Sequence, residues 1–482
     1  MLRITNTLSG EKEGWSPPAN REVRLYVCGV TVYEHCHLGH ARSAVVFDVI
    51  RNYLEYHGLS VRYVKNFTDI DDKIIRRAQE EGKEWKEIAE TFIASYKEDM
   101  TRLAVRPPTV APKATDYIPE MIGLIEGLIA KGVAYTIGGD VYFEVAKSPG
   151  YGKLSKQKPD EMVAGVRVEV DERKRSPLDF ALWKSSKPDE PAWKSPWGPG
   201  RPGWHIECSA MALRLLGETF DLHGGGKDLI FPHHENEIAQ SEAATGKQFV
   251  RTWIHHGFVT IDQEKMSKSL GNFFTLKEIF EKAPKFPEPV IAEVIRFYLL
   301  STHYRSAADF SDQSLSTAKS GLDRFYELFQ RIEEVEKRGA VPSASDSGVW
   351  NRFHEAFKGA MDDDFNTARA IGVLQELRAE VNARLAKNET ADVAAAKKLF
   401  QTLGGVLGLF RVPPVQWSHQ PWEKGFSAEA TLSDRAVEAL IREREEARRK
   451  KDWKKSDEIR DRLAQAGVVL EDRPDGSTRV KR

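Results

Sequence analysis

The chain contains 482 residues, of which 41% are hydrophobic and 30% are charged. This composition is typical of a folded globular protein and excludes a disordered or fibrous chain, while the length predicts two to four domains. The formal net charge of −1 excludes a bulk electrostatic attraction to nucleic acid, so an RNA partner would have to meet local basic patches. Three cysteines argue against a disulfide framework, and no apolar run is typical of a membrane span or a signal peptide. We therefore expect a cytoplasmic protein.

The first hundred residues predict a strand, a helix and a second strand. Residues 23–33 (VRLYVCGVTVY) are β-branched and aromatic, which favours a buried strand. The segment ARSAVVFDVIRNYLEYHG carries apolar residues at helical spacing up to Gly58, and VRYVKNFT follows as a strand. Such a unit implies a parallel sheet, whose functional loops lie at the carboxyl ends of the strands. The residues CHLGH, 36–40, fall at that end of the first strand.

The rest of the chain predicts an α/β protein with a Rossmann-type parallel sheet, an inserted subdomain, a helical bundle and a small C-terminal domain. Residues 111–200 contain a hairpin-like AYTIGGDVYFEV and a Pro/Trp/Gly-rich run, which is typical of an insertion. Alternation of strands and helices then resumes. From about residue 275 up to the last domain we expect helices only, and the last domain is predicted to be helical with a short strand-like segment, GVVLED. The predicted units are residues 1–110 and 201–275 for the two halves of the sheet domain, 111–200 for the insertion, 276–415 for the helical region and 425–482 for the last domain.

Two short motifs point to nucleotide chemistry. HLGH places His37 and His40 on either side of Gly39 at the predicted start of a helix, where positive potential favours phosphate. KMSKS places Lys265 and Lys268 after the predicted strand WIHHGFVTID, where lysines could neutralise a leaving pyrophosphate. Alone, the first motif could equally cap a helix and the second could be a solvated turn. Together and in this order they resemble the signatures of class I aminoacyl-tRNA synthetases, which implies activation of an amino acid with ATP.

The cysteines raise the question of a metal site. Cys28, Cys208, His233 and Glu237 would supply two sulfur atoms, one nitrogen and one oxygen, a set suited to tetrahedral zinc. Their spacing is not that of a local zinc knuckle, and each cysteine could equally be a small buried hydrophobic residue. From the residues alone, His234, His223 or Cys36 could replace any of these ligands.

A closer resemblance covers almost the whole chain. The segments YVCGVTVYEHCHLGH, NFTDIDDKIIRRA, PLDFALWK, GRPGWHIECSAM, FDLHGGGKDLIFPHHENEIAQ and EKMSKSLGNFFT, in this order and with matching spacing, resemble the bacterial cysteinyl-tRNA synthetase family. The resemblance implies an enzyme that forms cysteinyl-adenylate from cysteine and ATP, with magnesium, and transfers cysteine to the 3′ end of tRNA(Cys). It also implies one zinc ion held by Cys28, Cys208, His233 and Glu237, and a monomeric chain.

Zinc offers a physical route to selection against serine, which differs from cysteine only in carrying oxygen in place of sulfur. A pocket that selects by shape would separate the two amino acids only weakly. A thiol loses its proton on binding zinc far more readily than an alcohol does, and the thiolate forms a strong bond to this soft metal. We therefore expect the substrate sulfur to become an additional zinc ligand, and no editing domain to be needed.

The resemblance implies further site residues. The catalytic residues of the family fall here on His37, His40, Lys265 and Lys268, and ATP would be bound by these together with Gly39, Gly224, Gly225 and Asp228. Cysteine would be bound by Gly29, Thr68, Trp204 and His205. The anticodon would be bound by Arg448, Asp457 and Asp472 of the C-terminal domain. The segment 276–415 would contact the tRNA stem. For the acidic run DIDDK, residues 69–73, we favour a positioning role over magnesium ligation, and His35 and Cys36 are expected only to pack.

Three rival functions make different demands on the sequence. A ligase that joins cysteine to an amino-sugar resembles the catalytic part but lacks an anticodon-binding tail. A non-catalytic RNA-binding relative should show damaged signatures, and here both signatures are intact. A nucleotidyltransferase that shares His-x-Gly-His would not need the cysteines. The tail and the cysteines together favour the synthetase.

Overall fold

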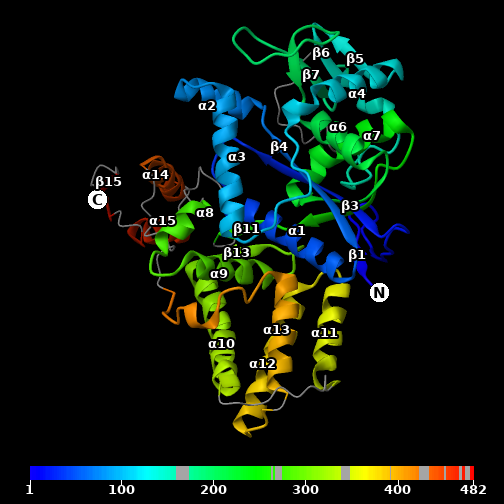
Figure 1. Cartoon of the computed structure of the whole chain (residues 1–482). Coiled ribbons are helices and arrows are strands. Elements are labelled where there is room, and N and C mark those ends of the chain that lie inside the picture. The colour runs from blue at the N-terminus through cyan, green and yellow to red at the C-terminus, as the bar shows by residue number, and fades with distance from the viewer. Residues whose placement is uncertain are drawn as a thin grey trace.

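The computed structural model places a parallel sheet at the centre of the protein (Figure 1). An antiparallel sheet with α4 lies on one side of it, and the helices α10–α13 extend from the other side. The structure describes residues 1–158, 173–261, 264–265, 274–337, 348–390, 392–422, 434–449, 452–465, 469–472 and 478–481. Among these residues, no helix combines the length and the apolar character that crossing a membrane requires.

The central sheet has the strand order β10-β9-β3-β4, and all its strands run parallel. The strands are β3 (Glu22–Thr31), β4 (Ser60–Thr68), β9 (Phe220–Gly226) and β10 (Val250–His256). Helix α1 (Leu38–Tyr56) connects β3 to β4, which confirms the predicted strand–helix–strand unit. Because β4 lies on one side of β3 and β9 on the other, the strand order changes direction between β3 and β9. Open α/β sheets bind ligands at such a point.

The sequence prediction was wrong about the segment WIHHGFVTID, which forms two strands in place of one. Strand β10 ends at His256, and β11 (Val259–Ile261) joins a separate sheet with β12 (Glu264–Lys265) and β13 (Ala308–Phe310). The break falls at Gly257, where a Cβ atom would lie 2.3 Å from the carbonyl oxygen of Ser306. Strand β13 also contradicts the expectation of helices alone after residue 275, because β11 needs a parallel partner.

The antiparallel sheet lies between β4 and β9 in the chain. Its strands are β5 (Ala134–Ile137), β6 (Asp140–Phe143), β7 (Phe180–Ser185) and β8 (Gly200–Pro202), which follow α2 (Asp72–Glu81), α3 (Trp85–Arg102) and α4 (Ile118–Ala130). Helices α6 (Trp204–Leu216) and α7 (Glu235–Thr245) share one hydrophobic core with α4 and with this sheet. Asp72 at the start of α2 pairs with Arg201 and Lys184, which connects α2 to β7 and β8.

A second core joins the other face of the parallel sheet to the helical region. This region contains α8 (Leu276–Lys282), α9 (Glu288–Leu300), α10 (Asp312–Lys337), α11 (Asn351–Asp362), α12 (Thr367–Ala386) and α13 (Val393–Leu407). The C-terminal elements are α14 (Asp434–Arg449), α15 (Trp453–Gln465), β14 (Val469–Asp472) and β15 (Thr478–Lys481), and a short pair, β1 (Arg3–Thr5) and β2 (Lys12–Gly14), begins the chain. The predicted sheet, bundle and small terminal unit are all present.

A buried ion pair fastens the helical region to α1. Asp48 of α1 lies 2.7 Å from the guanidinium of Arg296 in α9, and both side chains are 1% exposed. Arg296 also donates to the carbonyl oxygens of Leu103 and Leu407, so the guanidinium connects α3, α9 and α13 to α1. A Cβ at residue 408 would lie 2.1 Å from this guanidinium, which explains why the chain has Gly408 there.

Replacement of Arg296 with Met should destabilise the protein by about 3–5 kcal/mol, because buried Asp48 would lose its close counter-charge and keep only Arg106, whose Nε lies 3.9 Å away. The change is measured by equilibrium urea unfolding. The double variant Asp48→Asn/Arg296→Met should be more stable than Arg296→Met alone. Lys277→Met, at an exposed pair with Glu281, serves as the control and should cost less than about 1 kcal/mol. Equal losses in the single and the double variant would contradict this assignment.

Candidate active site and metal centre

The first turn of α1 holds the two histidines of the HLGH motif. His37 is the N-cap residue, and its Nδ1 accepts a hydrogen bond of 3.0 Å from the backbone N–H of Gly39. The Nδ1 of His40 accepts from the backbone N–H of His37 at 3.4 Å, and the two rings stack with their centroids 3.7 Å apart. Burial lowers the pKa of His40 well below its usual value, and the neighbouring His37 adds to this effect. Both Nδ1 atoms are therefore acceptors, which leaves Nε2–H as the donor on each ring.

A cavity of about 370 Å³ opens at the carboxyl ends of β3 and β9. The sequence-predicted residues that line it are Cys28, Gly29, His37, Gly39, His40, Trp204 and Asp228. The histidines of HLGH thus cap the helix and line the cavity at once, so the capping role and the ligand-binding role do not exclude each other. Side chains that could bind a metal and side chains that could bind a phosphate therefore line the same cavity.

A larger cavity of about 650 Å³ lies elsewhere, between α7 and the turn around Gly150. Its charged side chains include Lys153 and Glu242, which form an ion pair with each other. None of the sequence-predicted site residues lines it. We therefore place the active site in the smaller cavity.

The glycines of HGGGKD, residues 223–228, belong to strand β9, which ends at Gly226. A Cβ at Gly224 would lie 2.2 Å from the ring of Phe47 in α1, and one at Gly225 would lie 2.8 Å from the ring of His234. These two glycines allow close packing behind the cavity. Gly226 and Asp228 reach the cavity wall, and the ATP-binding role of Gly224 and Gly225 stays a prediction.

The KMSKS motif lies at the edge of the described structure. Lys265 is part of β12, where its backbone pairs with Thr260 of β11. Lys268 lies outside the described residues. The catalytic role of both lysines stays a prediction.

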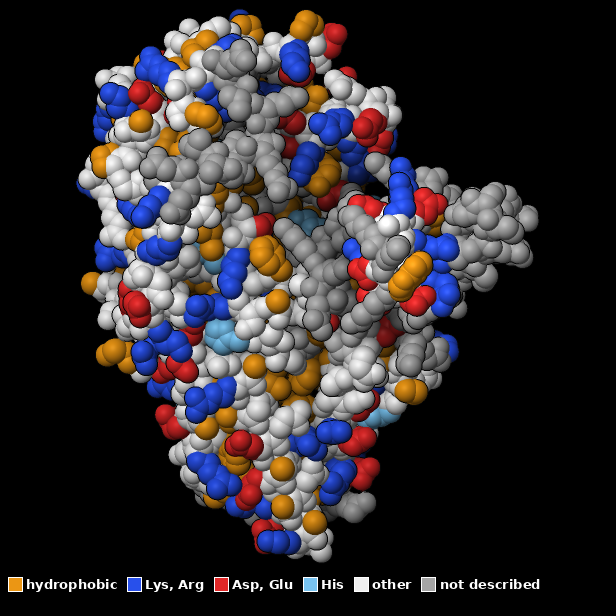
Figure 2. Space-filling view, turned by 180° about the vertical axis from the view of Figure 1, so that it is seen from behind, with side chains coloured by type: hydrophobic (Ala, Val, Ile, Leu, Met, Phe, Trp, Pro, Cys, Tyr) orange, Lys and Arg blue, Asp and Glu red, His pale blue; other side chains and the backbone are white. Residues whose placement is uncertain are grey.

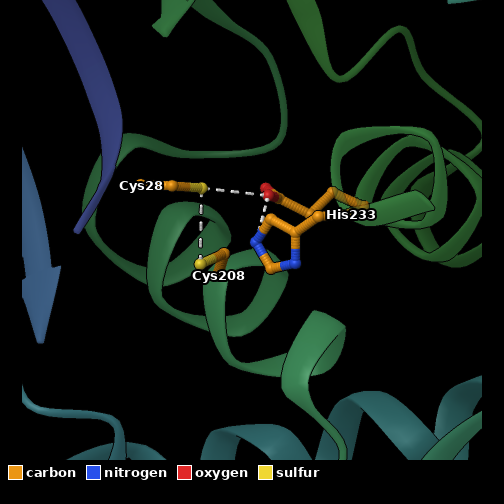
Figure 3. Close-up of side chains that lie close together, drawn as sticks. Cys28, Cys208 and His233 are labelled. Carbon is orange, nitrogen blue, oxygen red and sulfur yellow. Dashed lines mark hydrogen bonds and ion pairs between the residues drawn. The ribbon is translucent and has the colours of Figure 1, made fainter. Parts of the chain in front are cut away.

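The four predicted metal ligands converge (Figure 3). Cys28 from β3, Cys208 from α6 and His233 turn toward one another, and the carboxylate of Glu237 from α7 lies between Cys28 and His233. The Sγ atoms of Cys28 and Cys208 are 3.6 Å apart, and Glu237 Oε1 lies 3.2 Å from Cys28 Sγ and 3.1 Å from His233 Nε2. The four donor atoms all lie within 4.8 Å of one another, and all four residues are buried.

The spacing of four residues between His233 and Glu237 predicts both on one face of a helix, but His233 precedes α7 in a separate turn. Residues Ile230–His234 form a π-helical turn that contains the non-helical Phe231, and α7 begins at Glu235. The side chain of His233 still reaches Glu237 because the turn leads directly into the helix. Its other ring nitrogen, Nδ1, lies 2.9 Å from Nδ1 of His205, which orients the ring.

The charges of this cluster favour a bound cation. Burial, together with the neighbouring Cys208 and Glu237, raises the pKa of the Cys28 thiol well above its usual value. Burial alone would also raise the pKa of Glu237, but His223 and His233 hold it well below its ordinary range. Two sulfur atoms and a carboxylate this close repel one another once ionised, and a divalent cation between them removes that repulsion. The donor set therefore fits a metal ion.

A second set of donors shares two residues with the first. Cys28, His223, His234 and Glu237 are also buried with their donor atoms within 4.8 Å of one another. His223 Nε2 lies 2.9 Å from Glu237 Oε2, and His234 Nε2 lies 3.3 Å from Cys28 Sγ. The first set adjoins the cavity more directly, because the ring of Trp204, which lines the cavity and is 39% exposed, stacks on His233 at 4.2 Å.

The residues predicted to bind cysteine fall into two groups. Gly29 and Trp204 line the cavity, whereas His205 is half-buried beside Trp204, and Thr68 is 3% exposed. The hydroxyl of Thr68 donates to the carboxylate of Glu207 at 3.0 Å. Gly29 donates its N–H to Asn66 Oδ1 at 2.8 Å, and the side-chain amide of Asn66 contacts Thr68.

The sequence reasoning missed Asn66 and Glu207. The signal available for Asn66 was its position beside Lys65 in an otherwise apolar strand, VRYVKNFT. For Glu207 it was a carboxylate directly before a cysteine in a helix that is otherwise mostly buried. Their partners lie far away in the chain, so no local pattern assigns them a role.

The other residues singled out in the sequence are the predicted anticodon-binding residues, His35, Cys36 and the acidic run at residues 69–73. Arg448 lies near the end of α14, Asp457 is exposed on α15 beside Arg460, and Asp472 ends β14. His35 contacts Ser95 through its ring, and buried Cys36 accepts a backbone hydrogen bond from Leu276. In the acidic run, Asp69 accepts hydrogen bonds from Thr115 and Asp71 caps α2.

Comparison with known proteins shows which family has this site. The chain matches the model of the class I (C) tRNA synthetase catalytic domain over residues 15–320, the DALR domain over 356–411, and the cysteinyl-tRNA ligase anticodon-binding domain over 433–478. It is 51% identical to the cysteine–tRNA ligase of Thermodesulfovibrio yellowstonii, across 98% of both chains, and 53% identical to that of Geobacter metallireducens, across 99% of both. The chain belongs to the cysteine–tRNA ligase family.

Solved structures show the same fold in more distant synthetases. A methionyl-tRNA synthetase of Mycobacterium tuberculosis in complex with methionyl-adenylate superposes with a TM-score of 0.60 at 17% identity, covering 84% of this chain and 97% of that one. A putative arginyl-tRNA synthetase of Campylobacter jejuni gives 0.55 at 13% identity, covering 80% and 93%. The cysteine–tRNA ligase family thus shares its fold with class I synthetases of other specificities.

The two overlapping donor sets can be separated by their histidines. We expect His233→Ala to abolish tight metal binding, whereas His234→Ala should weaken it by no more than about 10–100-fold, as for a residue that supports a ligand. Competition with a chelator during zinc titration measures both affinities, and circular dichroism checks the fold of each variant. Loss of the metal in His234→Ala with retention in His233→Ala would assign the site to the second set.

Proposed function

We propose that this chain activates cysteine with ATP and transfers it to tRNA(Cys), using the cavity between β3, β9 and the first turn of α1 as its active site. The observation that carries the proposal is that a buried S₂NO donor set and the His37–His40 pair border the same cavity. A thiol bound beside Cys28 would place its own carboxylate within reach of a phosphate at the helix N-terminus. That geometry favours attack of the carboxylate on the α-phosphate in line with the leaving pyrophosphate.

His37 and His40 are proposed to stabilise the charge that builds up on the phosphoryl oxygens. Their Nδ1 atoms are occupied by backbone N–H groups, so each ring can turn only Nε2–H toward a ligand. A neutral imidazole held in one orientation donates without reorganisation at the moment of reaction. Lys265 and Lys268 are proposed to neutralise the pyrophosphate, and Gly39, Gly224, Gly225 and Asp228 to bind the rest of ATP, with magnesium on its phosphates.

The metal ion is proposed to be zinc, held by Cys28, Cys208, His233 and Glu237. When bound, it would supply a soft site for the substrate thiolate that the hydroxyl of serine cannot match. His205 would hold the ring of His233 in place, since their Nδ1 atoms lie 2.9 Å apart. Gly29, Thr68 and Trp204 would shape the surrounding pocket. None of the three cysteines forms a disulfide in the structure. Cys28 and Cys208 are therefore available as metal ligands.

The C-terminal unit is proposed to read the anticodon, and the helical region 276–415 to contact the tRNA stem. The match to an anticodon-binding domain supports this role and disfavours a ligase that joins cysteine to an amino-sugar. On the face shown in Figure 2, Lys and Arg side chains are interspersed with Asp and Glu, so the contact with RNA must rest on local groups. The remaining domain boundaries and the monomeric state stay predictions of the resemblance.

The first test is cysteine-dependent ATP–pyrophosphate exchange, with serine run in parallel. The protein should catalyse exchange with cysteine and discriminate against serine by at least about 10⁴-fold, the range in which direct recognition of a polar group operates. Cys208→Ser should lose bound zinc and most of this exchange. Exchange that ignores the identity of the amino acid would refute the proposed specificity, and full discrimination in Cys208→Ser would refute the zinc assignment.

The second test separates tRNA recognition from amino-acid activation. Arg448→Ala should raise the KM for tRNA(Cys) in aminoacylation by about 10–100-fold, as expected for the loss of one base-specific contact, and leave pyrophosphate exchange unchanged. Arg449→Ala, at the exposed neighbouring position of α14, is the matched control. If both variants charge tRNA as well as the unmodified protein, Arg448 has no role in recognition.

A further inference from the structure

Lys65 is a buried lysine in the wall of the active-site cavity to which the reaction described above gives no role. It lies near the carboxyl end of β4, where its backbone pairs with Val27 of β3, and its residue exposure is only 7%. It lines the same cavity as Cys28 and His40. The same cavity thus brings Lys65 together with one of the predicted metal ligands and with a histidine of the HLGH motif.

No carboxylate of the described chain lies within ion-pair distance of this ammonium group, although Glu34 and Asp228 line the same cavity. Within the described chain its Nζ forms no ion pair or side-chain hydrogen bond, and it lies 5.6 Å from the centroid of the Tyr96 ring. Burial lowers the pKa of Lys65 to about 8, so the side chain still carries a positive charge at neutral pH.

Other buried cations of the described chain have partners that explain them. Lys319 pairs with Asp323, Arg201 with Asp72 and Arg296 with Asp48, and Arg42 donates to backbone carbonyl oxygens. Burying a charge without a partner costs free energy, and such a charge persists where a ligand supplies the partner. Lys65 differs from these cations because the open side of its surroundings is the cavity.

We propose that Lys65 binds the anionic centre of the reaction, formed by the carboxylate of the amino-acid substrate and the α-phosphoryl group that this carboxylate attacks. The inference rests on the proposed function and adds a residue to it. The carboxylate of cysteine is three bonds from its sulfur, so a substrate held by sulfur beside Cys28 directs its carboxylate toward the middle of the cavity. A lysine there holds both anions near each other and offsets their mutual repulsion.

Three variants test the role of the charge. Lys65→Met keeps the length of the side chain and removes its charge, Lys65→Arg keeps the charge, and Lys97→Met changes an exposed lysine of α3 as the control. We expect kcat/KM for pyrophosphate exchange to fall by about 100-fold or more in Lys65→Met. It should fall less in Lys65→Arg and stay unchanged in Lys97→Met. Bound zinc should stay the same in all three variants.

Thermal unfolding of the ligand-free protein distinguishes ligand binding from a structural role. Removal of an uncompensated buried charge should leave the Tm of Lys65→Met unchanged or higher, although activity falls. Inhibition by ligand pairs then identifies the anion. Weaker binding of cysteine with unchanged binding of cysteamine identifies the carboxylate, and weaker binding of AMP with unchanged binding of adenosine identifies the phosphoryl group.

Two results would overturn the inference. The first is exchange within about threefold of the unmodified protein in Lys65→Met. The second is an equal loss of all four ligands with a lower Tm in both Lys65 variants, which would show that the lysine only supports the fold. The proposed function is tested by the activity of the unmodified protein alone. The role of Lys65 is tested by the activity or ligand affinity of each Lys65 variant divided by that of the unmodified protein. If the unmodified protein failed to exchange with cysteine, calorimetric binding of AMP and adenosine would still measure that ratio.

Discussion

The carboxylate of Glu237 is the group on which the arrangement of the site depends. It is fully buried, and its oxygens contact Cys28 of β3, His223 of β9 and His233 of the turn before α7 at 2.9–3.2 Å. A buried carboxylate is tolerated only with such partners, so α7 cannot shift without breaking contacts to two strands of the parallel sheet. Cys28 precedes the antiparallel sheet in the chain, whereas His223, His233 and Glu237 follow it. The contacts of Glu237 thereby hold donor atoms from these distant segments in one arrangement.

A second constraint acts at the floor of the cavity. The pairing of β3 with β4 changes register between Val27 and Val30, and Gly29 lies in this irregular stretch. A Cβ at Gly29 would lie 1.5 Å from the carbonyl oxygen of Asn66, so any side chain there would force the two strands apart. Asn66 in turn accepts the N–H of Gly29. The irregular stretch places Cys28 beside the metal-binding residues and leaves the backbone of Gly29 open to the cavity, which an uninterrupted parallel ladder would not do.

Local sequence patterns predicted the parts of this arrangement that depend on local physics. The helix start at HLGH, the strand before it and the two cysteines with His233 and Glu237 all follow from patterns that neighbouring residues carry or from the family resemblance. The close packing of Gly224 against the ring of Phe47 was not visible, because Phe47 is distant in the chain. The break at Gly257 likewise depends on the backbone of residues 305–306. Contacts of this kind are set by tertiary packing, and a glycine alone does not say which neighbour comes close.

The two ends of the cavity are held by different parts of the fold. The phosphate end is the first turn of α1, and the same helix is fastened at Asp48 to Arg296 and through it to the carbonyl oxygen of Leu407 in α13. The metal end depends on α6 and α7, which share their core with α4 and the antiparallel sheet. The helical region that matches the DALR domain thus contacts, through Arg296, the helix that begins at the two histidines, whereas the buried Cys/His/Glu cluster depends on a different core.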